Sequence, residues 1–490
     1  MKDGYRPVMH RLPRRDDPSD VRAYFDVSVP SVDNYRHWSM ATPSHANVAA
    51  NRQRRLISRN QARYEVTNNS WLDGIVDTLA AETVGDVGPS LQMSPQVPED
   101  VRRGIEEAWA DWSMKARLAE KLATGRRAKC VDGECFYMLV YDGLLPSDIK
   151  LNVKLIESDQ VGSPYDEMDD ETHYDGVRVS EAGEPVEYYV YTYHPYDNQG
   201  INASGPDGRW YYATQVIHLY NASRPGQLRG YTELLPCLPL AAILRRFTYA
   251  TLHAAEKAAD ISLVMHTTAS PDDPEDCIKP FYDEYSPVPF ERNMIVNLPY
   301  GWDAKQIQAE HPGNTYVEFV RQVVVEMGRC LSMPASVALG DSSDYNYASG
   351  RLDFQQFARA IEVDRRQQIE AKLLSQVFRA FLEEWLTLNT GASPFSLKLS
   401  DYPHRWYWQP RKTDDPEKNA DAVVKLRDAG LMADEEYWLE NGKDPDVQRA
   451  MIERQNKWRE KNGMPAPGNQ PGMKPMGSGE RETSNSEEED

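Results

Sequence analysis

None of the short motifs that bind phosphate or carry out hydrolysis occurs in the sequence. A phosphate-binding loop follows the pattern Gly-x4-Gly-Lys-Ser/Thr, but the one Gly-Lys pair, Gly442-Lys443, is followed by Asp444. The ten histidines are scattered without a His-Glu-x-x-His zinc motif, and there is no Gly-x-Ser-x-Gly nucleophile elbow. These absences disfavour an ATPase, a zinc hydrolase and a serine hydrolase, so we expect no enzyme and no cofactor.

Acidic residues are the remaining candidates for a metal site. The run Asp272-Asp273-Pro274-Glu275-Asp276 has the acidic density of a calcium loop, but Pro274 and the missing glycine and distal glutamate break that pattern. The run 166–171 is typical of an exposed turn. We interpret both runs as solvated loops and expect no metal site. A divergent metal-dependent nuclease that uses Asp341 and Asp344 stays open as an alternative.

The cysteines and the composition indicate a soluble intracellular chain. Cysteine occurs five times in 490 residues, an odd number, and Cys130 and Cys135 lack the partners that a zinc site needs. We therefore expect reduced thiols. The mostly apolar stretch 234–244 contains two prolines and is too short to cross a membrane. The N-terminus has no apolar core of the kind that signal peptides carry.

The formal net charge is −21 and the pI is about 5.0. Such a chain is not expected to hold duplex DNA on a basic face. It could instead form a wall past which DNA slides, because a wall without basic residues releases no counterions and grips phosphates weakly. Simple solubility explains an acidic balance equally well, so the charge alone does not decide between these functions.

Hydrophobic periodicity predicts helices followed by strands in the first half of the chain. Residues 1–50 are polar and predict an arm without a core of its own. Apolar residues recur at helical spacing over 51–85 and 99–123. The region 130–220 is β-rich. Its predicted strands are 135–141 and 151–156, with a hairpin formed by 177–179 and 186–191.

Helices dominate after residue 230. The first predicted helix is 234–260, in which Pro236 and Pro239 confine the regular part to the residues after them. Further helices are predicted at 315–331, 351–388, 415–429 and 433–460, and the segment 261–314 is irregular apart from a strand at 294–297. The loop 332–350 precedes the longest helix. From Gly463 onward the composition is typical of a disordered tail.

The longest predicted helix carries an apolar stripe, which we interpret as core or subunit packing instead of a cofactor site. Its members are Leu352, Phe354, Phe357, Ile361, Ile369, Leu373, Val377, Phe378, Phe381 and Trp385.

A series of local patterns in a fixed order resembles the lambda-type family of bacteriophage portal proteins. No pattern is specific alone, but their order and spacing over about 51–455 are. They are Arg59-Asn60, Asp132-Gly133-Glu134-Cys135-Phe136, 155–161, 216–220 followed by 224–230, 297–301, 340–349, 415–418 and 429–431.

The resemblance implies an α+β portal-type subunit. It has a mixed α/β wing, a helical stem, a clip excursion from the stem and a helical C-terminal crown. The implied divisions are an arm at 1–50, the wing at 51–230, stem helices at 231–264 and 313–333 with the clip at 265–312 between them, a channel loop at 334–350, a long helix and wing return at 351–410, the crown at 411–460 and a tail at 461–490.

The resemblance also implies a function and partners. The subunits would form a ring, expected to be a dodecamer, at one capsid vertex of the virion, after assembly in the host cytoplasm. DNA would pass through the ring during packaging and ejection, in transient contact with it. The partners would be the terminase large subunit, neck or head-completion proteins, and the major capsid and scaffold proteins, with no membrane. A different structural protein of head assembly stays open as an alternative to the portal protein.

Three groups of residues are the candidate sites. The channel loop would present Asp341, Ser343, Asp344, Tyr345, Asn346 and Tyr347 to DNA, with Gly340 and Gly350 as hinges. The clip would dock the motor and neck through Asp272, Asp273, Glu275 and Asp276. Arg224, Pro225, Gly226 and Gln227 are expected to form a rigid structural turn. Stem arginines such as Arg245 and Arg321 could pair with neighbouring subunits or face the channel.

Overall fold

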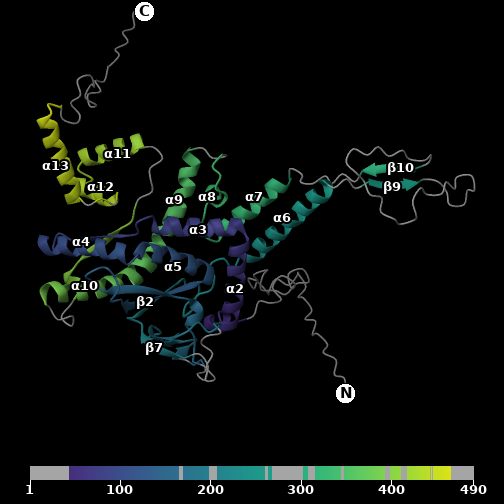
Figure 1. Cartoon of the computed structure of the whole chain (residues 1–490), viewed down its shortest axis with the longest axis horizontal. Helices are drawn as coiled ribbons and strands as arrows, with labels where there is room; N and C mark the ends of the chain where they lie inside the picture. Colours follow the sequence, from purple (N-terminus) through teal and green to yellow (C-terminus); the bar gives the residue numbers. More distant parts are fainter. Residues whose placement is uncertain are drawn as a thin grey trace, which may run out of the picture.

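The structure is a computed structural model. It describes residues 43–164, 169–170, 172–197, 207–259, 263–267, 302–306, 315–343, 347–391, 398–409, 416–441, 443 and 445–464. Most of the predicted arm, the predicted strand at 294–297 and the tail from 465 lie outside these residues. The described part mixes helices with small antiparallel sheets, which confirms the α+β class (Figure 1).

The N-terminal helices are α1 (Ala46–Ala49), α2 (Arg52–Asn68), α3 (Ser70–Val84), α4 (Glu99–Lys115) and α5 (Leu118–Asp132). The prediction of one helix over 51–85 was wrong, because Asn69 leaves the helical conformation and its side chain accepts hydrogen bonds from the backbone N–H groups of Trp71 and Leu72. The predicted helix 99–123 also breaks, at Arg117, whose φ is +54°. The helix after this break extends to Asp132, where strands were expected to have begun.

The strands predicted at 135–141 and 151–156 and the hairpin predicted at 177–191 are confirmed. β2 (Glu134–Tyr141) lies between β3 (Leu151–Ile156) and β8 (Val216–Tyr220), and both neighbours are antiparallel to it. A second sheet has the order β4 (His173–Tyr174), β5 (Val177–Val179), β6 (Pro185–Tyr191), β7 (Gly208–Tyr212). Two further strand pairs were not predicted: β1 (Ser90–Met93) with β11 (His404–Tyr407), and β9 (Leu263–Thr267) with β10 (Trp302–Gln306).

The C-terminal half follows the predicted helices with several corrections. The helices are α6 (Leu238–Ala259), α7 (Thr315–Arg329), α8 (Ala335–Leu339), α9 (Tyr347–Asp364), α10 (Ser375–Thr390), α11 (Pro416–Asp428), α12 (Asp434–Glu440) and α13 (Pro445–Lys461). The predicted loop 332–350 contains α8, and Gly350 lies inside α9, so it does not bound a loop. The predicted helix 433–460 is two helices. The longest helix runs from α9 to α10 through a π-helical segment, η3 (Arg365–Leu374).

The apolar stripe of this long helix is core, as predicted. Phe378 and Phe381 are fully buried against Trp109 of α4, with ring centroids 5.8 and 5.1 Å apart. The indole of Trp112 donates to the carbonyl of Leu151 at 2.7 Å, which ties α4 to β3. Leu352 is the exception in the stripe, because it is 64% exposed.

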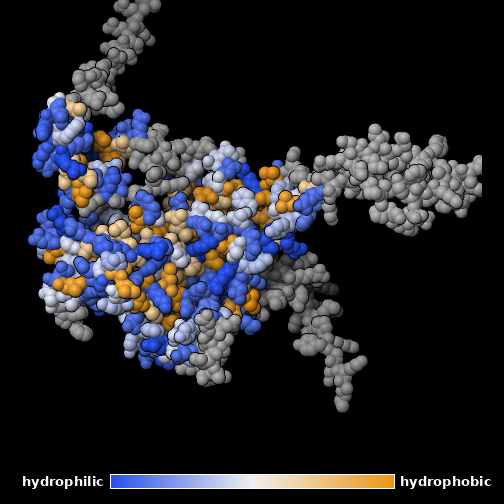
Figure 2. All heavy atoms as spheres, in the orientation of Figure 1, coloured by the Kyte–Doolittle hydropathy of each residue, from blue (hydrophilic) through white to orange (hydrophobic). Residues whose placement is uncertain are grey.

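The antiparallel pair α6 and α7 projects from this body (Figure 1). Phe247 of α6 holds the two helices together, since its ring lies 5.6 Å from Tyr316 and 4.9 Å from Phe319 of α7. Figure 2 shows hydrophobic surface on this projecting pair. Among the described residues, no helix is long and apolar enough to cross a membrane.

Candidate functional site

A cluster of buried charges joins six separate segments of the body. It consists of Arg55, Arg59, Glu134, Asp159, Asp175, His218 and Arg229, here called the Glu134 cluster. Each of these residues is at most 8% exposed. Helix α2 carries the first two arginines, β2 begins with Glu134, and His218 lies in β8. The sequence patterns at 59–60, 132–136, 155–161, 216–220 and 224–230 therefore meet at one place in the fold.

Glu134 is the centre of this cluster. Its Oε1 accepts from Arg229 at 2.7 Å, from Arg55 at 2.9 Å and from Arg59 at 3.2 Å. Its Oε2 accepts from Arg229 Nε at 3.0 Å, from the N–H of Gly230 at 2.9 Å, and lies 3.1 Å from His218 Nε2. Burial opposes ionisation of Glu134, but Arg229 and Arg55 hold its pKa well below the usual value. A carboxylate with this many donors has no free lone pair for acid–base chemistry, so its role is structural.

The cluster continues toward the surface through Arg63. Asp159 accepts from Arg59 at 2.6 Å and from Arg63 at 2.8 Å, and Arg63 also contacts Asp132 at 2.6 Å. His194 lies 3.2 Å from Glu157 and 3.9 Å from Asp159, so these three side chains have the spacing of a metal site. Both oxygens of Asp159 already accept from guanidinium groups, which supply the positive charge that a metal ion would bring. We interpret this group as an ion-pair network.

Protonation of His218 should weaken the fold. Burial lowers the pKa of His218 from 6.5 to about 4, against the opposing effect of its hydrogen bond to Glu134. The neutral ring donates from Nε2, and its buried Nδ1 has no hydrogen-bond partner. Between pH 6.5 and 4, His218 binds a proton in the unfolded chain but not in the folded chain. The free energy of unfolding is therefore highest above about pH 6.5 and declines below it.

We expect the His218→Gln variant to lose less stability than the wild type between pH 7 and pH 5, by on the order of 1–2 kcal/mol. The amide of glutamine can donate to Glu134 but does not titrate. Urea unfolding at the two pH values measures the difference. An identical pH dependence in both proteins would contradict this account of His218.

The expected turn at 224–227 lies beside the Glu134 cluster. The N–H of Gln227 donates to the carbonyl of Arg224 at 3.2 Å, and Gly226 has a φ of +75°, which glycine adopts without strain. The buried Gln227 side chain bridges Ser223 and the carbonyl of Arg229. Residues 43–50 pack on this segment, since Asn47 accepts from the N–H of Leu228 at 3.0 Å. The last part of the predicted arm therefore belongs to the folded body.

Only part of the expected channel loop lies within the described residues. Asp341 follows Gly340, the C-cap of α8 at φ +62°, and its carboxylate accepts from the N–H of Ser343 at 2.9 Å. Arg321 of α7 lies 3.7 Å from Asp341. Tyr347 begins α9, so it is helical and not part of a loop. Asp344, Tyr345 and Asn346, and the clip residues Asp272, Asp273, Glu275 and Asp276, lie outside the described residues.

Two of the stem arginines expected to pair with neighbouring subunits or to face the channel have partners within the chain. Arg245 of α6 pairs with Glu65 of α2 at 2.9 Å, and Arg321 pairs with Asp341. The pair of Arg245 and Glu65 fastens the start of the projecting helix to the body.

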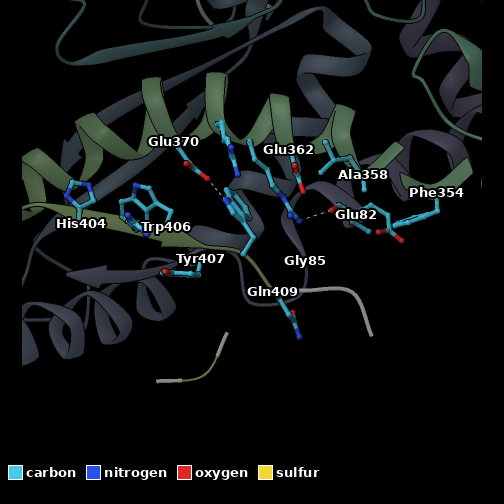
Figure 3. Close-up of a pocket in the computed structure, with 16 residues that line it drawn as sticks. Glu82, Gly85, Phe354, Ala358, Glu362, Glu370, His404, Trp406, Tyr407 and Gln409 are labelled. Carbon is cyan, nitrogen blue, oxygen red and sulfur yellow. Dashed lines mark hydrogen bonds between the residues drawn. The ribbon is translucent and has the colours of Figure 1, made fainter. Parts of the chain in front are cut away.

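A pocket of about 950 Å³, which the sequence did not reveal, lies between the end of α3, the continuous helix formed by α9 and η3, and β11 (Figure 3). Arg365 donates to the carbonyls of Thr83 at 2.7 Å and Glu82 at 2.9 Å, and so caps the end of α3. Trp408 donates to Glu370 at 2.6 Å. Arg365 is thus bonded to backbone carbonyls and Glu370 to an indole, and the residues that line the pocket include no serine, threonine, cysteine or lysine.

Comparison with known families matches residues 34–365 to the model described as "Phage portal protein, lambda family". No curated protein sequence matches the chain.

Solved structures similar to this chain include necks of gene transfer agent particles and a phage portal protein. The neck of an empty gene transfer agent particle, computed with C6 symmetry, shares 15% identity at a TM-score of 0.43, covering 77% of this chain and 91% of the other. The neck of the native particle, computed with C12 symmetry, shares 14% at 0.42, covering 78% and 92%. An HK97 family phage portal protein from Corynebacterium diphtheriae shares 13% at 0.30, covering 74% and 98%.

Proposed function

Because the chain belongs to the lambda family of phage portal proteins, we propose that it forms a closed ring at one capsid vertex, through which DNA enters and leaves. This is a structural function and not an enzymatic one. The subunit is a component of the virion, and its expected copy number is twelve. The observation that carries the ring is the exposed apolar surface of the projecting helices α6 and α7.

This surface is exposed on two sides of α6. Ile243 and Leu252 are 53% and 55% exposed. They lie nine residues apart, so at 3.6 residues per turn they point to roughly opposite sides of the helix. Val317 of α7 is 67% exposed as well. A closed ring uses two different faces of each subunit, one for each neighbour, and obligate contacts of this kind bury apolar side chains.

The ring can be tested directly on the purified chain. Light scattering should give a discrete oligomer at micromolar concentration, and negative-stain images should show a ring with a central hole. The same preparation should hydrolyse no ATP and nick no plasmid DNA after repurification. A stable monomer under these conditions would contradict the proposal, and a metal-dependent nicking activity would favour the nuclease alternative.

Each region of the subunit has a role in this ring. Residues 51–230 form the wing, α6 and α7 form the stem, and the segment 265–312 between them is the clip. Asp272, Asp273, Glu275 and Asp276 of the clip dock the terminase large subunit and later the neck proteins. Helices α11, α12 and α13 form the crown. The wing and crown face the capsid and scaffold proteins.

The segment between α8 and α9, together with the first residue of α9, is the part of the ring that DNA touches. Asp341, Ser343, Asp344, Tyr345, Asn346 and Tyr347 contact DNA through hydroxyl, amide and aromatic groups. Asp341 is exposed next to Arg321, so the contact surface carries both signs of charge. A surface without an excess of basic residues holds phosphates weakly, which lets DNA slide.

Replacing both Asp341 and Asp344 with lysine should slow DNA translocation, most strongly at low salt, because the added ammonium groups would bind phosphates. Packaging assays at two salt concentrations measure the effect. The matched control is Asp111→Lys on α4. Asp111, like Asp341, has an exposed side chain that pairs with a basic residue, and this variant should package DNA normally. Equal packaging by all three proteins at low salt would contradict the assignment of this segment to the channel.

A further inference from the structure

Two cysteines lie where α6 and α7 join the body. Cys237 directly precedes α6, and Cys330 directly follows α7. The packing of α6 on α7, in which Phe247 contacts Tyr316 and Phe319, places these two helix ends beside each other, and the two thiols interact. Both belong to the apolar cluster that includes Leu234, Leu238 and Met327. None of the four cysteines among the described residues is in a disulfide.

The surroundings of the two thiols differ. Cys237 is 2% exposed and its thiol donates to the carbonyl of Leu234 at 3.2 Å. Cys330 is only partly buried, and its thiol donates to the carbonyl of Met327 at 3.0 Å. The interaction between the two thiols lowers the pKa of Cys330 and raises the pKa of Cys237. Cys330 is thus the more acidic and the more accessible thiol of the pair.

Cys130 is the third thiol of this region. It lies on α5, is 1% exposed, and burial raises its pKa well above the usual value. It is therefore the less reactive neighbour, and it serves as an internal comparison for the other two.

We propose that Cys330 and Cys237 form a redox-active dithiol, which a peroxide converts into a disulfide between the end of α7 and the start of α6. This inference does not depend on the portal function, because it concerns two residues of one folded chain. It adds a modification site at the root of the projecting pair.

The reaction needs one peroxide for each disulfide. The Cys330 thiolate attacks one oxygen of hydrogen peroxide, the O–O bond breaks, and the departing hydroxide takes a proton to become water. The sulfur of Cys237 then attacks the sulfenic acid on Cys330, the S–S bond forms, the S–O bond breaks and a second water leaves. The two sulfurs are oxidised and the peroxide oxygens are reduced, so two thiols and one peroxide give one disulfide and two waters.

The position of the pair gives this bond a mechanical consequence. The aromatic contacts of Phe247 join α6 to α7 within their length, and the Arg245–Glu65 pair fastens α6 to the body. A disulfide at the root would prevent the two helices from separating. Thiols stay reduced in a cytosol and oxidise in oxidising surroundings, so the bond would form only when the protein leaves a reducing compartment.

The test treats the purified full-length protein with hydrogen peroxide, blocks the remaining thiols with iodoacetamide and maps the peptides by mass spectrometry. We expect one linked peptide pair containing Cys237 and Cys330, two hydrogens lighter than the reduced pair, which disappears on reduction. The melting temperature should rise on oxidation and fall back with dithiothreitol.

Matched variants separate the pair from the other cysteines. Cys237→Ser and Cys330→Ser should abolish both the linked peptide and the rise in melting temperature, and serine at 237 can still donate to Leu234. Cys130→Ser and Cys135→Ser should keep both results. Sulfinic acid on Cys330 without a disulfide, a link from Cys330 to Cys130 or Cys277, or a disulfide between two chains would each overturn the proposal.

Discussion

Replacing Glu134 with glutamine should destabilise the fold by about 3–5 kcal/mol, because it removes the buried charge that Arg55, Arg59 and Arg229 share. The amide nitrogen would also point a donor at groups that already donate. Urea unfolding, followed by tryptophan fluorescence, measures the change. We expect much of this variant to be unfolded at temperatures where the wild type is intact.

The control for this experiment is a solvent-exposed ion pair. Glu453 pairs with Lys457 on α13 at 2.6 Å, and both side chains are exposed. Glu453→Gln should therefore change the stability by less than about 1 kcal/mol. Equal effects of Glu453→Gln and Glu134→Gln would show that burial of the Glu134 cluster does not matter.

A second variant tests whether charge balance is the cause. Arg229→Met in the Glu134→Gln background removes one of the uncompensated guanidinium groups. We expect the double variant to be more stable than the sum of the two single losses predicts, because each single variant leaves an unpaired buried charge. Additive losses would indicate that the two residues act independently.

The ring should fall apart when charge is placed on the exposed apolar surface of α6. Ile243→Glu and Leu252→Glu alter side chains that are 53% and 55% exposed within the subunit, so the subunit itself should fold normally. In a ring contact each glutamate would be buried without a partner, at a cost of several kcal/mol. Light scattering at micromolar concentration should report monomers, with an unchanged circular dichroism spectrum.

Leu144 provides the matched control. It is 95% exposed in the turn between β2 and β3, away from the projecting helices. Leu144→Glu introduces the same charge on an equally apolar residue and should leave the oligomer intact. If the two α6 variants formed rings as readily as Leu144→Glu, the subunit contacts would lie elsewhere.

Local periodicity was sufficient to predict most helices and strands. The strands at 135–141 and 151–156 and the helices 315–331 and 351–388 agree with the structure within a few residues. The errors lie where one residue changes the backbone locally. Asn69 and Arg117 interrupt helices that an apolar pattern alone would continue. The spacing of apolar residues indicates which face of a segment is buried. When a helix breaks but the same face stays buried on both sides of the break, this spacing does not change, so it does not reveal the break.

Pairings between distant segments were not predictable in this way. β1 and β11 are more than 300 residues apart and are held together where Trp406 packs on Trp109 at 5.0 Å. Strands of four residues have too little pattern of their own to be recognised, because their stability comes from the partner strand and the core beneath it. The pocket beside Arg365 was missed for the same reason, since its walls come from separate elements.

The sequence by itself determined the α+β class, the order of the helices and strands, and the family patterns at Arg59, Glu134, Asp159 and Arg229. Only the tertiary structure decided that these residues meet in one buried cluster. They lie on α2, β2, η2 and the segment after β8, and a charged residue in a sequence does not reveal whether it will be buried. A buried charge is tolerated only beside its counter-charges, and that neighbourhood exists only once the chain has folded.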